Sequence, residues 1–192
     1  MSGDDRSRLR DLLARRSFRV GTFELSSGGT SDYYVDCRTT TMHAEGQVLV
    51  GRVGWSALDE AGLRPELVGG LTMGADPISY ALAGESWRRG EPVHAFSVRK
   101  RSKEHGTGQR IEGCFEAGRR VVVTEDVITT GGSALDAVGE VEEAGGEVLA
   151  VLALVDREEG GRGHLEEAGH RVLSLFTARE LAGAAGEAPP GA

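Results

Sequence analysis

The stretch Arg120–Ala137, RVVVTEDVITTGGSALDA, decides the fold. Three consecutive valines, Val121–Val123, predict a strand buried on both faces, because a parallel sheet covered by helices needs continuous apolar runs. Two acids follow, Glu125 and Asp126, and then a run of hydroxyl residues and glycines at 129–133. The apolar spacing that comes next suits a helix. The stretch therefore predicts a strand, an acidic pair, a small-residue turn and a helix.

The turn at 129–133 has the composition of an anion-binding site. The first N–H groups of a helix lack partners within the helix, and the helix dipole favours negative charge beside them. Glycines let the backbone close around a phosphate, and the hydroxyls of Thr129, Thr130 and Ser133 add donors. The two acids before the turn repel phosphate and need another partner: ribose hydroxyls, a divalent metal or a cation that develops during a reaction. A ligand that joins a phosphate to a ribose satisfies both halves.

Other interpretations of this stretch are weaker. An ordinary strand-to-helix turn with a capping Ser and solvated acids is the structural alternative. A nucleotide-binding P-loop is disfavoured because no Gly-Lys-Ser/Thr follows, and no G-x-G-x-x-G supports a dinucleotide-binding fold.

Length and composition favour a single domain over residues 1–192. A chain of 192 residues is long enough to bury roughly 70% of its unfolded surface. The formal charge of −8 argues against a nucleic-acid partner. The absence of an 18-residue apolar run and the charged start MSGDDRSRLR argue against a membrane segment or a signal peptide, so we expect a cytoplasmic protein. Cys37 and Cys114 stand far apart, without metal-ligand spacing, and are expected to be free thiols.

Helices and strands are expected to alternate along the chain. The predicted helices cover residues 4–16, 44–61 and 77–87, the segment after the turn, and a short piece around Leu165; the predicted strands cover 67–70, 93–98, the valine run, 148–155 and 172–176. This order predicts an α/β fold with a parallel sheet and right-handed crossovers. Residues 17–40, with a Ser/Gly/Thr turn at 26–30, predict two or three short strands that form a cap beside the sheet. The tail 182–192 is expected to be frayed.

Four polar segments fall at the carboxyl ends of predicted strands, where ligands bind in such sheets. They are residues 69–76, 99–112, 125–133 and Asp156–Arg157. We expect all four to meet on one rim of the sheet.

The segment Arg99–Arg110, RKRSKEHGTGQR, has five Lys or Arg residues against one Glu in an acidic chain. Because it has two glycines and no apolar anchor, it cannot pack in a core and is expected to be mobile. A mobile cationic loop beside a phosphate site suits a lid that closes over a diphosphate, excludes water and stabilises the charge of the leaving group. A solvated basic surface loop is the alternative.

Several of these segments resemble one known family. VVVTEDVITTGGSAL resembles the 5-phosphoribosyl-1-diphosphate (PRPP) signature of type I phosphoribosyltransferases. RKRSKEHGTG resembles the catalytic loop of orotate phosphoribosyltransferases, and FELSSGGTSDYYVDCR, IEG and VDREEGG are similar to further segments of that family. The resemblance implies a type I phosphoribosyltransferase-like fold: a parallel sheet flanked by helices, with a small N-terminal cap, or hood, contributed mainly by residues 17–40.

The resemblance also implies an activity. Members of the family transfer the 5-phosphoribosyl group from PRPP to N1 of orotate, which yields orotidine 5′-monophosphate and pyrophosphate in de novo pyrimidine (UMP) biosynthesis. It implies Mg²⁺ on the diphosphate and ribose of PRPP. It further implies a homodimer in which the loop Arg99–Arg110 acts in trans, in the active site of the partner subunit.

The resemblance assigns roles to positions of this chain. The catalytic residues it implies are Lys103, His105, Asp126 and Glu125. The PRPP-binding residues it implies are Arg99, Lys100, Lys103, His105, Glu125, Asp126, Val127, Ile128, Thr129, Thr130, Gly131, Gly132 and Ser133. It assigns orotate to Thr129 and Arg157, and a planar guanidinium does pair bidentately with a carboxylate.

Some positions depart from the family pattern. Ser26 and Met73 stand where many relatives have a Lys that contacts phosphate, so we expect weaker PRPP binding. Glu125 replaces the more frequent Asp, which keeps the charge but moves the carboxylate. Tyr33 and Tyr34 either stack near the base or form a packed aromatic pair in the cap.

Two other functions share the predicted cradle. Another nucleobase phosphoribosyltransferase, for a purine or uracil, is expected to lack the loop sequence and Arg157. A PRPP-sensing regulator without catalysis usually needs a DNA-reading module, and no basic helical segment of this chain predicts one.

Overall fold

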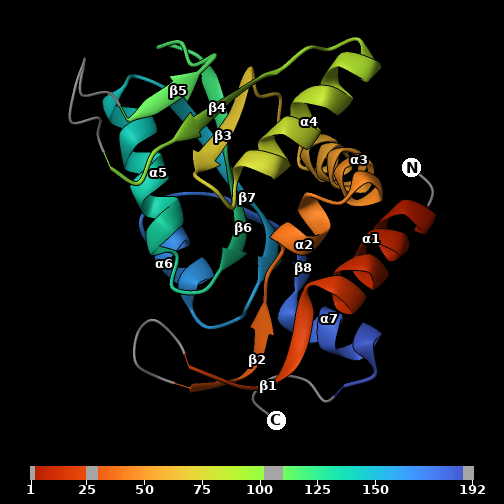
Figure 1. Cartoon of the computed structure of the whole chain (residues 1–192). Helices are drawn as coiled ribbons and strands as arrows, with labels where there is room; N and C mark the ends of the chain where they lie inside the picture. Colours follow the sequence, from red (N-terminus) through yellow and green to blue (C-terminus); the bar gives the residue numbers. More distant parts are fainter. Residues whose placement is uncertain (1–2, 25–29, 102–109, 188–192) are drawn as a thin grey trace.

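The structure is a computed structural model that describes residues 3–24, 30–101 and 110–187. Within these residues a six-stranded sheet has the strand order β5-β4-β3-β6-β7-β8 (Figure 1). Its strands are β3 (Leu67–Leu71), β4 (His94–Val98), β5 (Ile111–Gly113), β6 (Arg120–Ile128), β7 (Glu147–Asp156) and β8 (Val172–Thr177). All neighbours pair in parallel except β5, which is antiparallel to β4. The predicted parallel sheet is confirmed; β5 was not predicted, because three residues are too few to show a period.

Helices cover both faces of the sheet. They are α1 (Gly3–Arg16), α2 (Arg38–Thr41), α3 (Ala44–Glu60), α4 (Asp76–Arg89), α5 (Gly132–Glu143), α6 (Gly161–Glu167) and α7 (Ala178–Ala185). In Figure 1, α5 and α6 lie on one side of the sheet, and α1, α3, α4 and α7 lie on the other. None of the described helices combines the length and apolar composition needed to cross a membrane.

The valine run of β6 explains why the core has two halves. Val121 and Val123 pack in the half that contains α5 and α6, whereas Val122 packs in the half that contains α1, α3 and α4. All three side chains are fully buried. Successive side chains of a strand point to opposite faces, so a strand covered on both sides needs an apolar residue at every position.

The predicted cap is a two-stranded antiparallel hairpin, β1 (Phe18–Glu24) and β2 (Thr30–Val35). The ring of Phe18 stacks on that of Tyr33 at a centroid distance of 5.4 Å. The hairpin lies beside the carboxyl ends of β6 and β7 (Figure 1). This position brings the end of β2 to the rim where the polar segments gather.

The C-terminal segment differs from the expected frayed tail. Residues 182–185 belong to α7, and both Leu181 and Ala182 are buried. Thr177 and Glu180 form a reciprocal capping box: the Thr177 hydroxyl accepts from the Glu180 N–H at 3.2 Å, and the Glu180 carboxylate accepts from the Thr177 N–H at 2.9 Å. The prediction was wrong for 182–185, because small residues carry little hydrophobic signal and this helix is stabilised by tertiary burial.

Gly70 in β3 marks a close approach of two strands in the sheet. A Cβ at Gly70 would lie 2.1 Å from the carbonyl oxygen of Thr124 and 2.7 Å from the Cβ of Ala75. We therefore expect Gly70→Ala to lower the free energy of unfolding by about 2 kcal/mol or more, measured by urea denaturation. Gly139→Ala in α5 is the control, since its Cβ meets nothing within 4 Å, and it should gain about 0.5–1 kcal/mol. Equal stability of the two variants contradicts the packing described.

Candidate active site

A cavity of about 810 Å³ opens at the carboxyl ends of the parallel strands, between the sheet and the end of β2. Of the predicted site residues, it brings together Lys100, Glu125, Asp126, Val127, Thr129, Ser133 and Arg157. Residues 72–74 and Asp76 line it as well. The four polar segments therefore meet on one rim, as predicted from their places at strand ends.

A small recess of about 70 Å³ adjoins this cavity at the start of α5. It is lined by Glu125, Val127, Ile128, Thr129, Thr130, Gly131, Gly132 and Ser133. Gly131 caps the helix with φ 83°, in the left-handed region that glycine tolerates. The first N–H groups of α5 have no acceptor within the helix, so the recess has the donor pattern of an anion site.

The turn between β7 and α6 supports the recess from behind. The N–H of Gly161 donates to the carbonyl oxygen of Thr129 at 3.1 Å. A Cβ at Gly161 would lie 2.4 Å from that oxygen and 2.7 Å from the Gly131 nitrogen. Gly161, the second glycine of VDREEGG, thus allows the two backbones to come into contact, which holds residues 129–131 in place.

The acidic pair lies at the mouth of the recess. Glu125 is 6% exposed, and its carboxylate accepts a hydrogen bond from the backbone N–H of Asp126 at 3.1 Å. The Asp126 carboxylate accepts from the backbone N–H of Val127 at 2.9 Å. Burial, and next the hydrogen-bonded carboxyl group of Asp126, raise the pKa of Glu125 well above its usual value. A hydroxyl-bearing or cationic ligand relieves the repulsion between these two acids.

Arg157 is held in a fixed orientation under the cap. Its Nε donates to the Tyr33 hydroxyl at 3.0 Å and to Glu159 Oε1 at 2.9 Å, and its Nη2 donates to Ser31 Oγ at 3.0 Å. The guanidinium carbon lies 4.4 Å from the centroid of the Tyr33 ring. The sequence alone cannot reveal this support, because Ser31 and Tyr33 are more than a hundred residues away from Arg157. Within the described residues, Nη1 makes no hydrogen bond.

The two tyrosines of the cap have different environments, which answers the question left open by the sequence. Tyr33 is 6% exposed and packs between Phe18 and Arg157. Tyr34 is 40% exposed and lines the main cavity. Tyr33 is therefore a packing and positioning residue, and Tyr34 is the one available to a ligand.

The structure describes only the two ends of the basic segment. Lys103 and His105 lie outside the described residues, as does Ser26. Lys100 lines the main cavity, whereas Arg99 lines a neighbouring depression together with Thr72 and Glu112. Arg99 Nη1 lies 3.4 Å from Glu112 Oε1. The ends are joined, since the N–H of Arg99 donates to the carbonyl oxygen of Arg110 and Arg110 Nε donates to the Arg99 carbonyl, both at 2.8 Å.

The sequence missed two charged residues of the cavity wall. Asp36 and Arg38 follow β2 and line the cavity together with the acidic pair. Their signal was weak: a single acid and a single base after a predicted cap strand have no distinctive spacing. Asp76, at the start of α4, was noted only as part of a polar segment and also lines the cavity.

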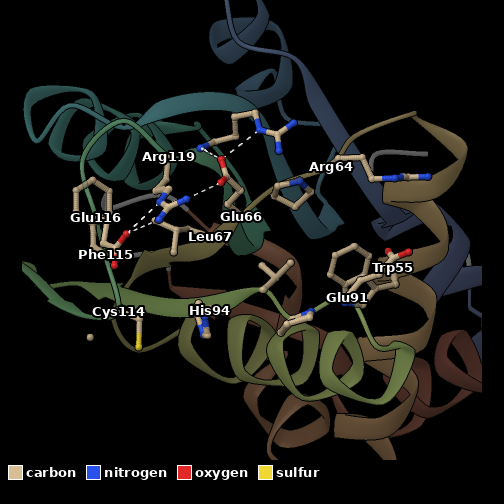
Figure 2. A pocket seen from close by; sticks show the side chains of 15 residues that line it. Trp55, Arg64, Glu66, Leu67, Glu91, His94, Cys114, Phe115, Glu116 and Arg119 are labelled. Atoms are coloured by element: carbon tan, nitrogen blue, oxygen red, sulfur yellow. Dashed lines mark hydrogen bonds and ion pairs between the residues drawn. The ribbon is translucent and has the colours of Figure 1, made fainter.

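A second cavity, of about 700 Å³, lies at the opposite ends of the strands (Figure 2). Its arginines are already paired: Arg119 bonds Glu66 and Glu116 at 2.9 and 2.8 Å, and Arg120 bonds Glu66 at 3.2 Å. A hydrogen bond from the Arg120 backbone, together with the two arginine side chains, lowers the pKa of Glu66 to about 2. Since these charges satisfy one another, the candidate active site is the cavity at the carboxyl ends.

Glu125 gives the site a pH signature. Its raised pKa means that the native state holds the proton more tightly than the unfolded state, so the free energy of unfolding falls as pH rises above the usual value of 4.5. Glu125→Gln removes this loss. The stability gained over the wild type should therefore increase from pH 4.5 to pH 8 in urea denaturation. The control is Glu142→Gln, at an exposed position of α5. If the difference in free energy of unfolding between each variant and the wild type is the same at every pH, the assigned effect of burial on Glu125 is refuted.

Comparisons with known proteins agree with this geometry. No family model matches the chain. The orotate phosphoribosyltransferase of Aquifex aeolicus (strain VF5) is 46% identical over 180 residues, which cover 92% of this chain and 97% of the relative. That of Bradyrhizobium sp. (strain ORS 278) is 45% identical and covers 92% and 96%.

Solved structures of the same enzyme share the fold. The crystal structure of Mycobacterium tuberculosis H37Rv orotate phosphoribosyltransferase in complex with inorganic phosphate matches with a TM-score of 0.81 and 40% identity, over 94% of this chain and 99% of that one. The PRPP complex of that enzyme matches with a TM-score of 0.78 and 40% identity, over 93% and 99%. With such identity along nearly the full length of these relatives, and with the motif, the fold and the cavity in agreement, the chain belongs to the orotate phosphoribosyltransferase family.

Proposed function

We propose that this protein transfers the 5-phosphoribosyl group of PRPP to N1 of orotate and releases pyrophosphate. The observation that carries the proposal is the meeting of the amide recess, the acidic pair and Arg157 in one cavity. Each element suits a different part of the two substrates. The product, orotidine 5′-monophosphate, places the reaction in de novo pyrimidine biosynthesis.

The recess at the start of α5 holds the 5-phosphate. Backbone N–H groups of residues 129–133 and the hydroxyls of Thr129, Thr130 and Ser133 donate to its oxygens, and each such bond to a charged group contributes roughly 1.5–3 kcal/mol. Glu125 and Asp126, at the mouth of the recess, accept hydrogen bonds from the ribose hydroxyls. Val127 and Ile128 contribute backbone to the same wall.

Arg157 selects the base. Orotate has a carboxylate that purines and uracil lack, and a guanidinium pairs with a carboxylate through two parallel hydrogen bonds. Glu159 and Tyr33 occupy the Nε side of Arg157, so the Nη1 end is the side left for the substrate. Thr129 and Tyr34 line the same cavity and lie beside the base.

The reaction is a displacement at C1 of the ribose. The bond from C1 to the diphosphate oxygen breaks, and its electron pair leaves with pyrophosphate; N1 of orotate loses its proton to solvent or to the departing pyrophosphate, and the N1 electron pair forms the new bond to C1. Bond breaking ahead of bond making leaves positive charge on the ribose, and the carboxylates of Asp126 and Glu125 stabilise that charge more than the ground state. Arg99, Lys100, Lys103 and His105 stabilise the departing diphosphate.

Mg²⁺ fits this site together with the substrate. Among the described residues no group of three or more His, Cys, Asp or Glu side chains is arranged to hold a metal. Mg²⁺ usually binds through one or two carboxylates plus substrate phosphates, and Asp126 and Glu125 are carboxylates beside the recess. When bound, the ion supplies positive charge against the diphosphate.

A homodimer is part of the proposal. Tyr80 and Trp87 are seven residues apart on α4, so they share one face, and they are 55% and 76% exposed. Met73, 58% exposed in the cavity wall, precedes the same helix. Exposed apolar surface of this kind favours a protein interface. The Tyr80 hydroxyl lies 3.3 Å from Ser97 Oγ, two residues before Arg99, where the segment that we expect to act in trans begins.

The cytoplasm is the proposed location. Cys37, which is buried, and Cys114, which is exposed, are both free thiols. Free thiols are typical of reducing compartments.

The activity is tested with purified protein, orotate, PRPP and Mg²⁺, with pyrophosphate release as the readout. Uracil, adenine and guanine should not replace orotate. Arg157→Gln should raise KM for orotate by about 10- to 100-fold, because a charge-assisted pair is lost, and should leave KM for PRPP within about twofold. Pyrophosphate release with another base and none with orotate contradicts the proposal.

Sharing of sites is tested with mixed dimers. Lys103→Ala and Asp126→Asn should each abolish most of kcat. Lys103→Ala removes a cation that stabilises the departing diphosphate, and Asp126→Asn removes a carboxylate that stabilises the positive charge on the ribose. If the loop acts in trans, a mixed dimer contains one intact site, and random mixing restores about a quarter of the wild-type activity. No recovery, with dimers confirmed by sedimentation, argues that each subunit supplies its own loop.

A further inference from the structure

Arg38 is a cation in the wall of the main cavity. It follows β2, begins α2 and lines the cavity together with Lys100, Asp126 and Arg157. Its side chain keeps 46% of its surface exposed. The cavity therefore gives this arginine a position from which it can face a ligand.

Asp36 fixes the plane of this guanidinium. Arg38 Nε donates to Asp36 Oδ1 at 2.8 Å and Nη2 donates to Oδ2 at 3.0 Å, while the backbone N–H of Arg38 also donates to Oδ1 at 3.1 Å. Because the guanidinium is already held in place, binding a ligand costs little conformational entropy of the Arg38 side chain. Nη1 makes no hydrogen bond within the described residues.

Arg38 and Arg157 share this arrangement. In each, a carboxylate occupies the Nε side, which is Asp36 for Arg38 and Glu159 for Arg157. In each, the Nη1 end is left for a ligand. Two arginines oriented in this way in one cavity indicate two anionic groups to be bound.

The anionic groups of the two substrates suggest which group each arginine binds. The amide recess accounts for the 5-phosphate, and Arg157, under the cap, accounts for the carboxylate of the base. The diphosphate is the remaining anion, and Lys100 is the other cationic side chain that the described residues place in the cavity wall. Arg38 and Lys100 line this cavity together with residues 72–74.

Resting on the proposed function, we propose that Arg38 is a binding residue for the diphosphate of PRPP. Its Nη1 and the second hydrogen of Nη2 donate to diphosphate oxygens, and Asp36 keeps the guanidinium aligned when the cavity is empty. Met73 is an exposed, uncharged side chain in the same cavity wall, so the wall leaves much of the diphosphate charge to Arg38 and Lys100.

The test is calorimetric titration of Arg38→Gln with three probes in the presence of Mg²⁺: PRPP, inorganic pyrophosphate and ribose 5-phosphate. The dissociation constants for PRPP and pyrophosphate should rise by at least about tenfold, as expected for a lost charge-assisted pair. The constant for ribose 5-phosphate, which lacks the diphosphate, should stay within about twofold. KM for orotate should also be unchanged, which separates Arg38 from Arg157.

Three further variants distinguish a lost contact from an indirect effect of the substitution. In Arg38→Gln, Asp36 is left unpaired and could itself repel the ligand; the double variant Asp36→Asn/Arg38→Gln should still bind PRPP weakly. Arg64→Gln is the matched control, because Arg64 is a partly exposed arginine, 3.1 Å from Asp59, in the other cavity, and it should bind all three probes normally. Met73→Lys in the Arg38→Gln background should restore most of the lost PRPP affinity, since it returns a cation to the same wall.

The outcomes that overturn the inference are specific. They are wild-type PRPP affinity in Arg38→Gln, recovery in the Asp36→Asn/Arg38→Gln variant, an equal loss for ribose 5-phosphate, or no gain from Met73→Lys. Melting temperatures check that each variant is folded. If the proposed function is wrong, the wild-type protein makes no orotidine 5′-monophosphate. The comparison of pyrophosphate binding between the wild type and Arg38→Gln then still tests the role of Arg38. Wild-type protein that binds neither PRPP nor pyrophosphate overturns both.

Discussion

The placement of two adjacent acids at the end of β6, with Glu125 buried and Asp126 partly exposed, is the constraint on which the cavity depends. A strand covered on both faces carries Glu125 into a nearly water-free position, and this burial raises the pKa of its carboxyl group. Among the described residues, both carboxylates accept hydrogen bonds from backbone N–H groups, and no cationic side chain donates to either of them. Such an arrangement destabilises the unliganded protein, so it is best explained by a ligand that supplies hydroxyl donors or positive charge.

The rest of the rim is organised around that pair. The recess at the start of α5 follows the acids directly in the chain, so its N–H and hydroxyl donors lie at a fixed distance from the two carboxyl groups. The β7–α6 turn supports the recess through Gly161 and also carries Arg157 into the cavity. The cap contributes Tyr33 behind Arg157, and the segment after β2 adds the Asp36–Arg38 pair to the cavity wall. Hydrogen-bond donors that suit anionic groups therefore surround a centre that is itself acidic. This arrangement suits the cationic transition state of the proposed reaction.

Much of the fold was predictable from the sequence, because its signals are local. Continuous valines indicated a buried strand, and glycines and hydroxyls indicated an anion-binding turn. The misses have physical reasons: α7 consists largely of small residues and is held by the burial of Ala178, Leu181 and Ala182, and β5 is too short to show alternation. The partners of Arg157 and the position of Arg38 depend on how the cap packs against the sheet, and contacts between residues so distant in the chain leave no pattern within any one segment.

The most direct test is a crystal structure of the protein with PRPP and Mg²⁺. The account predicts 5-phosphate oxygens within about 2.7–3.2 Å of backbone nitrogens in residues 129–133, with the ribose hydroxyls on Glu125 and Asp126. A 5-phosphate bound anywhere else, such as the cavity at the opposite ends of the strands, contradicts it.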